Sequence, residues 1–246
     1  MSSEMIVGSF NVRVPCDPAP HDWENRKKRV LKDLAALQYD IFGAQEAVPM
    51  QIADMEKAGY KHLGHGRDRD LTGEGTPVFY RAERFEPLAD KTIWLSETPE
   101  VFSMDYGSTY PRLATIVRFR DRRTGRELVF ANVHLEHRLN NEECRKNQIC
   151  VLLRELKTFQ AKGLPLILTG DFNAHPDEAA YKLCAERFCD SFQISQTPPV
   201  RPEGKTFHSF LKSRRNEITD QPIDFIFVSK GIAVLSGKSD AAADES

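Results

Sequence analysis

The chain has 246 residues, of which 40% are hydrophobic and 28% charged, and this composition suits one large globular domain. Its formal net charge of −2 excludes a strong positive field that would attract nucleic acid over a distance, although a local basic patch stays open. Five cysteines without CxxC spacing predict neither a disulfide framework nor a zinc site. The sequence also has no signal-peptide pattern and no membrane-spanning apolar run. Together these features favour a protein in the cytoplasm with reduced cysteines.

The first part of the chain predicts alternating strands and helices. Residues 5–12 and 40–45 are apolar and rich in strand-forming residues. Asp22 can cap a helix that begins at Trp23 and carries apolar side chains at helical spacing. Residues 49–58 predict a second helix. This strand–helix–strand–helix order indicates a layered α/β fold.

The rest of the chain predicts further strands around one long helix. The next four strands are expected at residues 77–80, 91–96, 114–120 and 127–134. Residues 122–125 predict a hairpin turn between the last two of them, and residues 142–162 predict the longest helix. Two more buried strands are expected at residues 164–169 and 223–228.

The domain organisation follows from the absence of internal repeats and of low-complexity linkers. We expect one domain over residues 1–236, built from two packed sheets with helices outside. Residues 237–246 have no apolar pattern, and they predict a disordered polar tail.

Polar side chains stand at or near the ends of the apolar strands. They are Asn11, Glu46, His134, Asp171, Asn173 and Asp224. In layered α/β folds such strand ends can converge on one cleft. Three carboxylates, two amides and an imidazole there would suit Mg²⁺ or Mn²⁺, which prefer oxygen ligands, rather than zinc.

Each of these residues also has an ordinary structural explanation. Asn11 can hydrogen-bond a turn, Glu46 can cap the next helix, and His134 can be an interior histidine with its hydrogen bonds satisfied. Asp171 and Asn173 follow a glycine, as turn residues often do, and the last carboxylate can pair with a nearby arginine. Their joint placement at strand ends favours a shared site.

The same residues resemble the motifs of the endonuclease/exonuclease/phosphatase superfamily. Five segments occur in the family's order: 9–11 (Ser-Phe-Asn), 45–46 (Gln-Glu), 133–135 (Val-His-Leu), 170–174 (Gly-Asp-Phe-Asn-Ala) and 223–226 (Ile-Asp-Phe-Ile). Residues 94–99, 111–112 and 206–208 are similar to a bacterial subgroup. The resemblance covers about residues 6–235 and implies a four-layer α/β/β/α sandwich of the deoxyribonuclease I-like type.

The resemblance also implies a metal site and an attacking water. Glu46 would be the main ligand of Mg²⁺ (or Mn²⁺), and Asn11 would lie beside it and help to hold the metal. Asp171 would belong to the metal site, and it would orient or deprotonate the water that attacks phosphorus.

Four further residues would act on the phosphate side. Asn173 would bind a phosphate oxygen, and His134 would hydrogen-bond the phosphate or assist the leaving group. Glu74 would orient that histidine. Asp224 would pair with a late catalytic histidine, as it does in the family.

The family's last motif, Ser-Asp-His, lacks its histidine here. Ser239-Asp240 is followed by Ala241, and no histidine occurs after His208. We therefore expect the family's final strand to be missing. Three functions stay open: a metal-dependent phosphoesterase, a catalytically impaired phosphate-ester binding protein on the same fold, and a structural domain. The substrate could be a nucleic acid, a nucleotide, a sugar phosphate or a lipid head group, and a monomer is expected.

Overall fold

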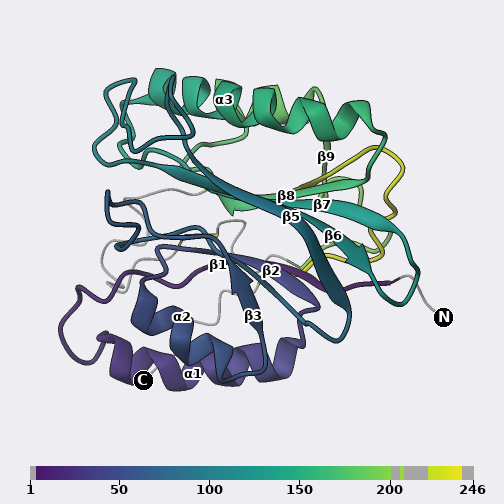
Figure 1. Ribbon diagram of the computed structural model, residues 1–246, viewed down its shortest axis with the longest axis horizontal. Helices are drawn as coiled ribbons and strands as arrows, with labels where there is room; N and C mark the ends of the chain where they lie inside the picture. The colour runs from purple at the N-terminus through teal and green to yellow at the C-terminus, as the bar shows by residue number, and fades with distance from the viewer. Residues whose placement is uncertain (1–3, 201–205, 208–220, 240–246) are drawn as a thin grey trace.

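Two β-sheets lie face to face in the computed structural model, and helices cover both outer faces (Figure 1). The structure describes residues 4–200, 206–207 and 221–239. The layers follow the order helices, sheet, sheet, helices, so the expected α/β/β/α sandwich is confirmed. The expected loss of a final strand concerns residues beyond 239, which lie outside these ranges.

The first sheet has four strands, in the order β1-β2-β4-β3. Its strands are β1 (Val7–Asn11), β2 (Ile41–Gln45), β3 (Lys61–Leu63) and β4 (Val78–Tyr80). Helices α1 (Trp23–Leu37) and α2 (Pro49–Glu56) cover its outer face. Asp22 caps α1 as expected, because its side chain accepts a hydrogen bond from the Asn25 N–H at 2.9 Å. The buried side chains of Leu34 and Met55 anchor the two helices on the sheet.

The second sheet has six strands, in the order β5-β6-β7-β8-β10-β9. Its strands are β5 (Phe85–Trp94), β6 (Leu113–Asp121), β7 (Glu127–His134), β8 (Leu166–Asp171), β9 (Cys189–Asp190) and β10 (Asp224–Val228). Helices α3 (Glu142–Ala161) and α4 (Ala179–Ala185) cover it through a large apolar core. Across the described ranges, no helix combines the length and apolar character that a bilayer crossing requires.

The space between the sheets changes from apolar to polar along the strands. Ile41, Phe130 and Ile167, near the beginning of their strands or in mid-strand, belong to an apolar cluster. Further along the same faces, Asn132 of β7 and Thr169 of β8 are fully buried. The polar part of the interior therefore lies towards the carboxyl ends of β2, β7 and β8.

Asn132 joins the two sheets through its side-chain amide. Its Nδ2 donates to the backbone oxygens of Ala44 at 2.7 Å and Pro77 at 3.2 Å. Its Oδ1 accepts from Gln45 Nε2 at 2.7 Å and from Thr169 Oγ1 at 3.1 Å. Both hydrogens and both lone pairs of the amide are thus engaged, as a buried amide requires.

Gly43 makes this contact between the sheets possible. A Cβ atom at Gly43 would lie 2.3 Å from Asn132 Oδ1 and 2.4 Å from Thr169 Oγ1. Both distances are far below van der Waals contact, and the neighbours are themselves held by hydrogen bonds. A side chain here would push the sheets apart.

Some elements differ from the sequence expectations. The structure adds β3, α4 and β9, which are all short, and β5 begins at Phe85 rather than at residue 91. The early part of β5 contains Pro87, a bulge and exposed side chains, so it carries no clear alternating pattern. The hairpin turn at residues 122–125 is confirmed, since Gly125 donates to the Asp121 carbonyl at 2.7 Å.

The beginning of the expected polar tail is hydrogen-bonded to a neighbouring segment. The Val200 N–H donates to the Gly237 carbonyl at 2.9 Å, and the Ser239 N–H donates to the Val200 carbonyl at 2.7 Å. Residues 237–239 are therefore paired with the chain, while residues 240–246 lie outside the described ranges.

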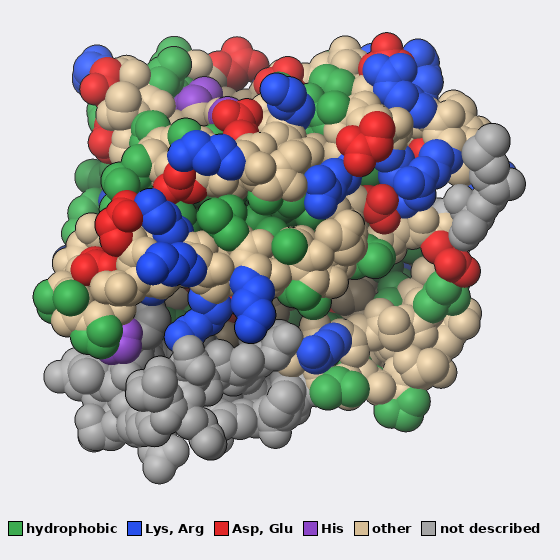
Figure 2. Space-filling model, turned by 90° about the horizontal axis from the view of Figure 1, so that it is seen from below, with side chains coloured by type: hydrophobic (Ala, Val, Ile, Leu, Met, Phe, Trp, Pro, Cys, Tyr) green, Lys and Arg blue, Asp and Glu red, His purple; other side chains and the backbone are tan. Residues whose placement is uncertain are grey.

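The surface carries mixed charge. On the face that Figure 2 shows, basic and acidic side chains are interspersed over most of the described residues. This pattern agrees with the net charge of −2 and gives that face no broad basic field.

We predict that Gly43→Ala lowers the free energy of unfolding by about 2–3 kcal/mol, because the added methyl group overpacks the contact between the sheets. Urea denaturation measures the change. Gly237→Ala is the matched control: its Cβ would meet Phe192 at an ordinary 3.4 Å, so a change within about 0.5 kcal/mol is expected. Equal stability of the two variants would contradict a tight contact between the sheets at Gly43.

Candidate active site

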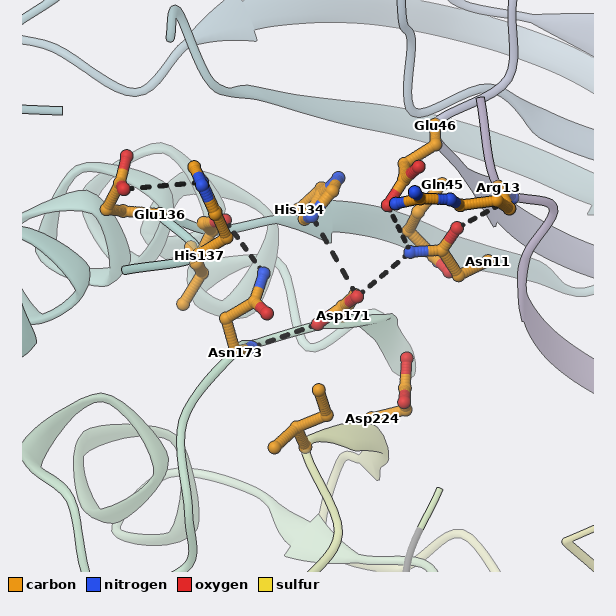
Figure 3. Close-up of polar contacts among 12 residues, drawn as sticks. Asn11, Arg13, Gln45, Glu46, His134, Glu136, His137, Asp171, Asn173 and Asp224 are labelled. Carbon is orange, nitrogen blue, oxygen red and sulfur yellow. Dashed lines mark hydrogen bonds and ion pairs between the residues drawn. The ribbon is translucent and has the colours of Figure 1, made fainter. Parts of the chain in front are cut away.

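The polar side chains expected from the sequence gather where strands of both sheets end (Figure 3). They are Asn11, Glu46, His134, Asp171, Asn173 and Asp224. Parallel pairing of β7 with β8 places His134 opposite Asp171, and antiparallel pairing of β8 with β10 places Asp224 opposite Asp171. In the four-stranded sheet, Asn11 ends β1 and Glu46 directly follows β2. The fold thus brings the whole predicted set to one edge.

The Asn11 amide connects carboxylates from the two sheets. Its Nδ2 donates to Glu46 Oε1 at 2.9 Å and to Asp171 Oδ2 at 3.0 Å. The backbone holds both ends of this arrangement: the Val14 N–H donates to Glu46 Oε2, and the Arg13 N–H donates to Asn11 Oδ1, each at 2.9 Å. Glu46 itself has a φ of 59°, a left-handed conformation that is strained for a residue with a side chain.

Asp171 is buried, and its pKa is raised to about 6. Burial is the main cause, and the negative charge of Glu46 adds to it. Hydrogen bonds from the Asn11 amide and from the Asn173 N–H, at 3.0 Å, act in the opposite direction. Asn173 has a φ of 45°, and its side chain donates to the Leu135 carbonyl at 3.1 Å. A group with a pKa near 6 can exchange a proton at physiological pH.

The donor set fits a hard divalent cation. Within the described part of the chain, no three His, Cys, Asp or Glu side chains form a group that could hold a metal on their own. Here two carboxylates and one amide stand together, and Mg²⁺ commonly takes one or two carboxylates and completes its shell with water. The amide nitrogen of Asn11 lies between the two acidic oxygens, where positive charge is favoured. Glu46 and Asp171 could therefore hold Mg²⁺ or Mn²⁺. Asn11 could join them only through its amide oxygen, which here accepts from the Arg13 N–H, so its amide would have to turn over to become a ligand.

His134 is neutral in this environment. Burial lowers its pKa well below 6.5, and the charges of Arg112 and Arg67 lower it further. Its Nε2 lies 3.1 Å from Arg112 Nη1 and 3.8 Å from Asp171 Oδ2. The second distance is too long for a hydrogen bond, and a neutral ring forms no ion pair with the carboxylate. His134 therefore contributes hydrogen bonds and no charge.

Glu74 lies beside His134, but its carboxylate binds an arginine. Arg67 donates to its two oxygens at 2.7 and 3.1 Å, whereas the resemblance implies a contact with His134. Burial raises the pKa of Glu74, and the charge of Arg67 opposes this. Glu74, Arg67, Arg112 and His134 together line a narrow hollow next to the site.

Asp224 stands at the partly exposed margin of the site. Its backbone N–H donates to Thr206 Oγ1 at 3.1 Å, which ties the start of β10 to that residue. Asp240, which follows Ser239, and His208, the last histidine of the chain, both lie outside the described ranges.

Glu136 is a site neighbour that the sequence analysis did not single out. It is fully buried and accepts hydrogen bonds from Ser108 Oγ at 2.9 Å, from the Thr109 N–H at 2.7 Å and from the Arg138 N–H at 3.1 Å. Burial alone would raise the pKa of Glu136, but these hydrogen bonds lower it to about 2. Glu136 thus fastens the loop at residues 108–110 to the turn after β7. The signal available in the sequence was a charged residue two positions beyond His134.

Comparison with known proteins gives a consistent result. The sequence model of the Endonuclease/Exonuclease/phosphatase family matches residues 8–246. A mannosyl-6-phosphatase of Bacteroides thetaiotaomicron is similar in structure, with a TM-score of 0.86 and 31% identity, over 95% of this chain and 88% of that one. An endonuclease/exonuclease/phosphatase protein of Bacteroides vulgatus has a TM-score of 0.82 and 31% identity, over 94% and 88%.

Curated relatives include nocturnin of Mus musculus, which is 27% identical over 251 residues. The match covers 94% of this chain and 55% of nocturnin. The chain therefore spans about half the length of this curated relative.

We predict that Glu136→Gln lowers the free energy of unfolding by about 2–3 kcal/mol near pH 7, because the hydrogen bonds lose their charged acceptor. The folded pKa of about 2 lies below the ordinary 4.5, so the stabilisation is present above pH 4.5 and is lost as the pH falls towards 2. Denaturant titrations near pH 7 and near pH 3 should thus show that the difference in unfolding free energy between the unmodified chain and Glu136→Gln is smaller at the lower pH.

The control for this prediction is Glu143→Gln, whose side chain is 72% exposed and which should change stability by less than about 0.5 kcal/mol. If Glu136→Gln lowers the free energy of unfolding by the same amount at both pH values, the stabilising role of the buried charge is refuted.

Proposed function

Since the chain belongs to the endonuclease/exonuclease/phosphatase family, we propose that it hydrolyses phosphodiester or phosphomonoester bonds with the help of Mg²⁺ or Mn²⁺. The observation that carries this proposal is the pair of carboxylates, Glu46 and Asp171, that the Asn11 amide joins across the two sheets. A purely structural role would leave unexplained the strained backbone of Glu46 and the raised pKa of Asp171.

Glu46, Asn11 and Asp171 would hold the metal. When bound, a divalent cation stabilises the negative charge that develops on the phosphoryl oxygens during hydrolysis. The positions of the three side chains are fixed beforehand by hydrogen bonds to one another and to the backbone. Apart from a turn of the Asn11 amide, little rearrangement is then needed when metal and substrate arrive.

Asp171 would orient the attacking water and accept its proton. It is buried at the end of β8, and its side chain is oriented by hydrogen bonds from the Asn11 amide and the Asn173 N–H. Asn173 would bind a phosphate oxygen, since its amide nitrogen carries a second hydrogen beyond the one donated to Leu135. Neutral His134 would stand next to the phosphate and assist through hydrogen bonding.

The comparisons support a broad range of phosphoester substrates. The Bacteroides thetaiotaomicron neighbour is named a mannosyl-6-phosphatase, and at 31% identity it brings sugar phosphomonoesters into this range. Nucleic acids and nucleotides remain in the range as well. The net charge of −2 provides no strong positive field, which favours small substrates over long nucleic acids.

We predict that hydrolysis of p-nitrophenyl phosphate or of its bis ester requires Mg²⁺ or Mn²⁺ and stops on chelation with EDTA. Glu46→Gln, which keeps the shape but removes the charge, should lower kcat/KM by about 10²–10⁴. It should also weaken Mn²⁺ binding, followed by water-proton relaxation, by about tenfold or more.

Glu186→Gln, at the exposed C-terminal end of α4, is the control and should leave both quantities unchanged. Full activity after exhaustive chelation would contradict the metal requirement. Binding of Mn²⁺ without turnover of any ester would instead favour the phosphate-ester binding protein.

A further inference from the structure

Arg112 differs from two other buried arginines, Arg84 and Arg145, because it has no acidic partner within the described ranges. Arg84 forms ion pairs with Asp40 at 2.8 Å and Asp121 at 3.2 Å. Arg145 forms an ion pair with Glu178 at 2.6 Å. Arg112, which immediately precedes β6 and is only 5% exposed, has no carboxylate within ion-pair distance among the residues that the structure describes.

The hydrogen bonds of Arg112 go to two histidines. Its Nη1 donates to His134 Nε2 at 3.1 Å, and its Nη2 donates to His137 Nδ1 at 2.9 Å. A guanidinium group can only donate, so both ring nitrogens accept and both imidazoles are neutral. The buried Nε–H of Arg112 has no partner in the described part of the chain. Its positive charge is therefore solvated by neutral groups alone.

Such a charge is unfavourable without an anion close to it. Burial lowers the pKa of Arg112, and the neighbouring charge of Arg67 lowers it further, while carboxylates at longer range act in the opposite direction. Burying an uncompensated ion costs several kcal/mol, so a site that keeps one is built to receive an anion. Arg67 does not share this property, because Glu74 neutralises it.

The space at Arg112 is small. The hollow that it lines with Arg67, Glu74 and His134 has a volume of about 10 Å³, which is about the size of one water-sized group. The Glu74 carboxylate there is paired with Arg67, so the charge of Arg112 is the one left over. One phosphoryl oxygen fits in the hollow. His134, which separates Arg112 from Asp171, places the hollow beside the carboxylates of the site.

We propose that Arg112 is a specificity-determining residue, which binds a terminal oxygen of the substrate's phosphoryl group and selects phosphomonoesters over phosphodiesters. The cause of the selection is charge. A monoester dianion brings more negative charge to the buried guanidinium than a diester monoanion does, so the same contact stabilises the monoester more. This assignment rests on the proposed function, since the phosphoryl group must lie at the same site.

The test compares two esters in the full chain. Arg112→Gln should lower kcat/KM for p-nitrophenyl phosphate at least about tenfold more than for bis(p-nitrophenyl) phosphate, because a charged hydrogen bond is worth about 1.5–3 kcal/mol. Arg120→Gln is the matched control: it lies on β6 near the end remote from Arg112, is 44% exposed, and should change neither value. An equal loss on both esters would overturn the selectivity.

Binding of inorganic phosphate gives a second readout that does not need turnover. With Mg²⁺ present, calorimetry should show phosphate binding about tenfold or more weaker in Arg112→Gln than in the unmodified chain. Arg112→Met, an uncharged side chain suited to a buried position, carries the same expectations if the Gln variant fails to fold. Unchanged phosphate affinity in a folded variant would overturn the assignment of Arg112. Absence of turnover in the unmodified chain would instead count against the proposed function.

Discussion

The hydrogen bonds of the Asn132 amide are the interaction on which the arrangement of the site depends. The residues proposed to hold the metal come from both sheets: Asn11 and Glu46 from one, and Asp171 from the other. The geometry of the site therefore depends on how the two sheets are aligned. Asn132 lies two residues before His134 and bonds to Gln45, the residue before Glu46. A buried amide with all four positions engaged tolerates no sliding of one sheet over the other, because any shift would leave polar groups unsatisfied.

The electrostatics of the site change from one end to the other. Glu46 and Asp171 form an acidic end, where the amide of Asn11 stands between them. His134 lies in the middle and is neutral, and buried Arg112 forms a basic end beyond it. A cation is favoured at the first end and a phosphoryl anion at the second, so the two ends together suit a phosphoester bound to a metal. The fixed hydrogen bonds around Glu136 keep the loop beside this basic end in place.

The sequence predicted the parts of the site that depend on local pattern. A polar residue at the end of an apolar strand is visible in the sequence, and strand ends at one edge bring Asn11, Glu46, His134 and Asp171 together. The four layers could be predicted for the same reason, since long periodic elements such as α3 and β7 dominate them.

Other features depend on contacts between distant segments, and no local pattern reports them. Asn132 looks like an ordinary strand residue until β2 and β4 are placed against β7. Likewise, the pairing of Glu74 with Arg67 rather than with His134 is decided by the course of the loop between β3 and β4. The isolation of Arg112 from carboxylates is a property of three-dimensional packing alone.

The position of Mn²⁺ in crystals of this protein, located from its anomalous scattering, tests most directly whether the two sheets share one metal site. One peak is expected, at about 2.0–2.5 Å from carboxylate oxygens of both Glu46 and Asp171, with the amide of Asn11 beside it. A peak that contacts only one sheet, or a strong peak elsewhere with none between these carboxylates, would contradict a site assembled across the sheets.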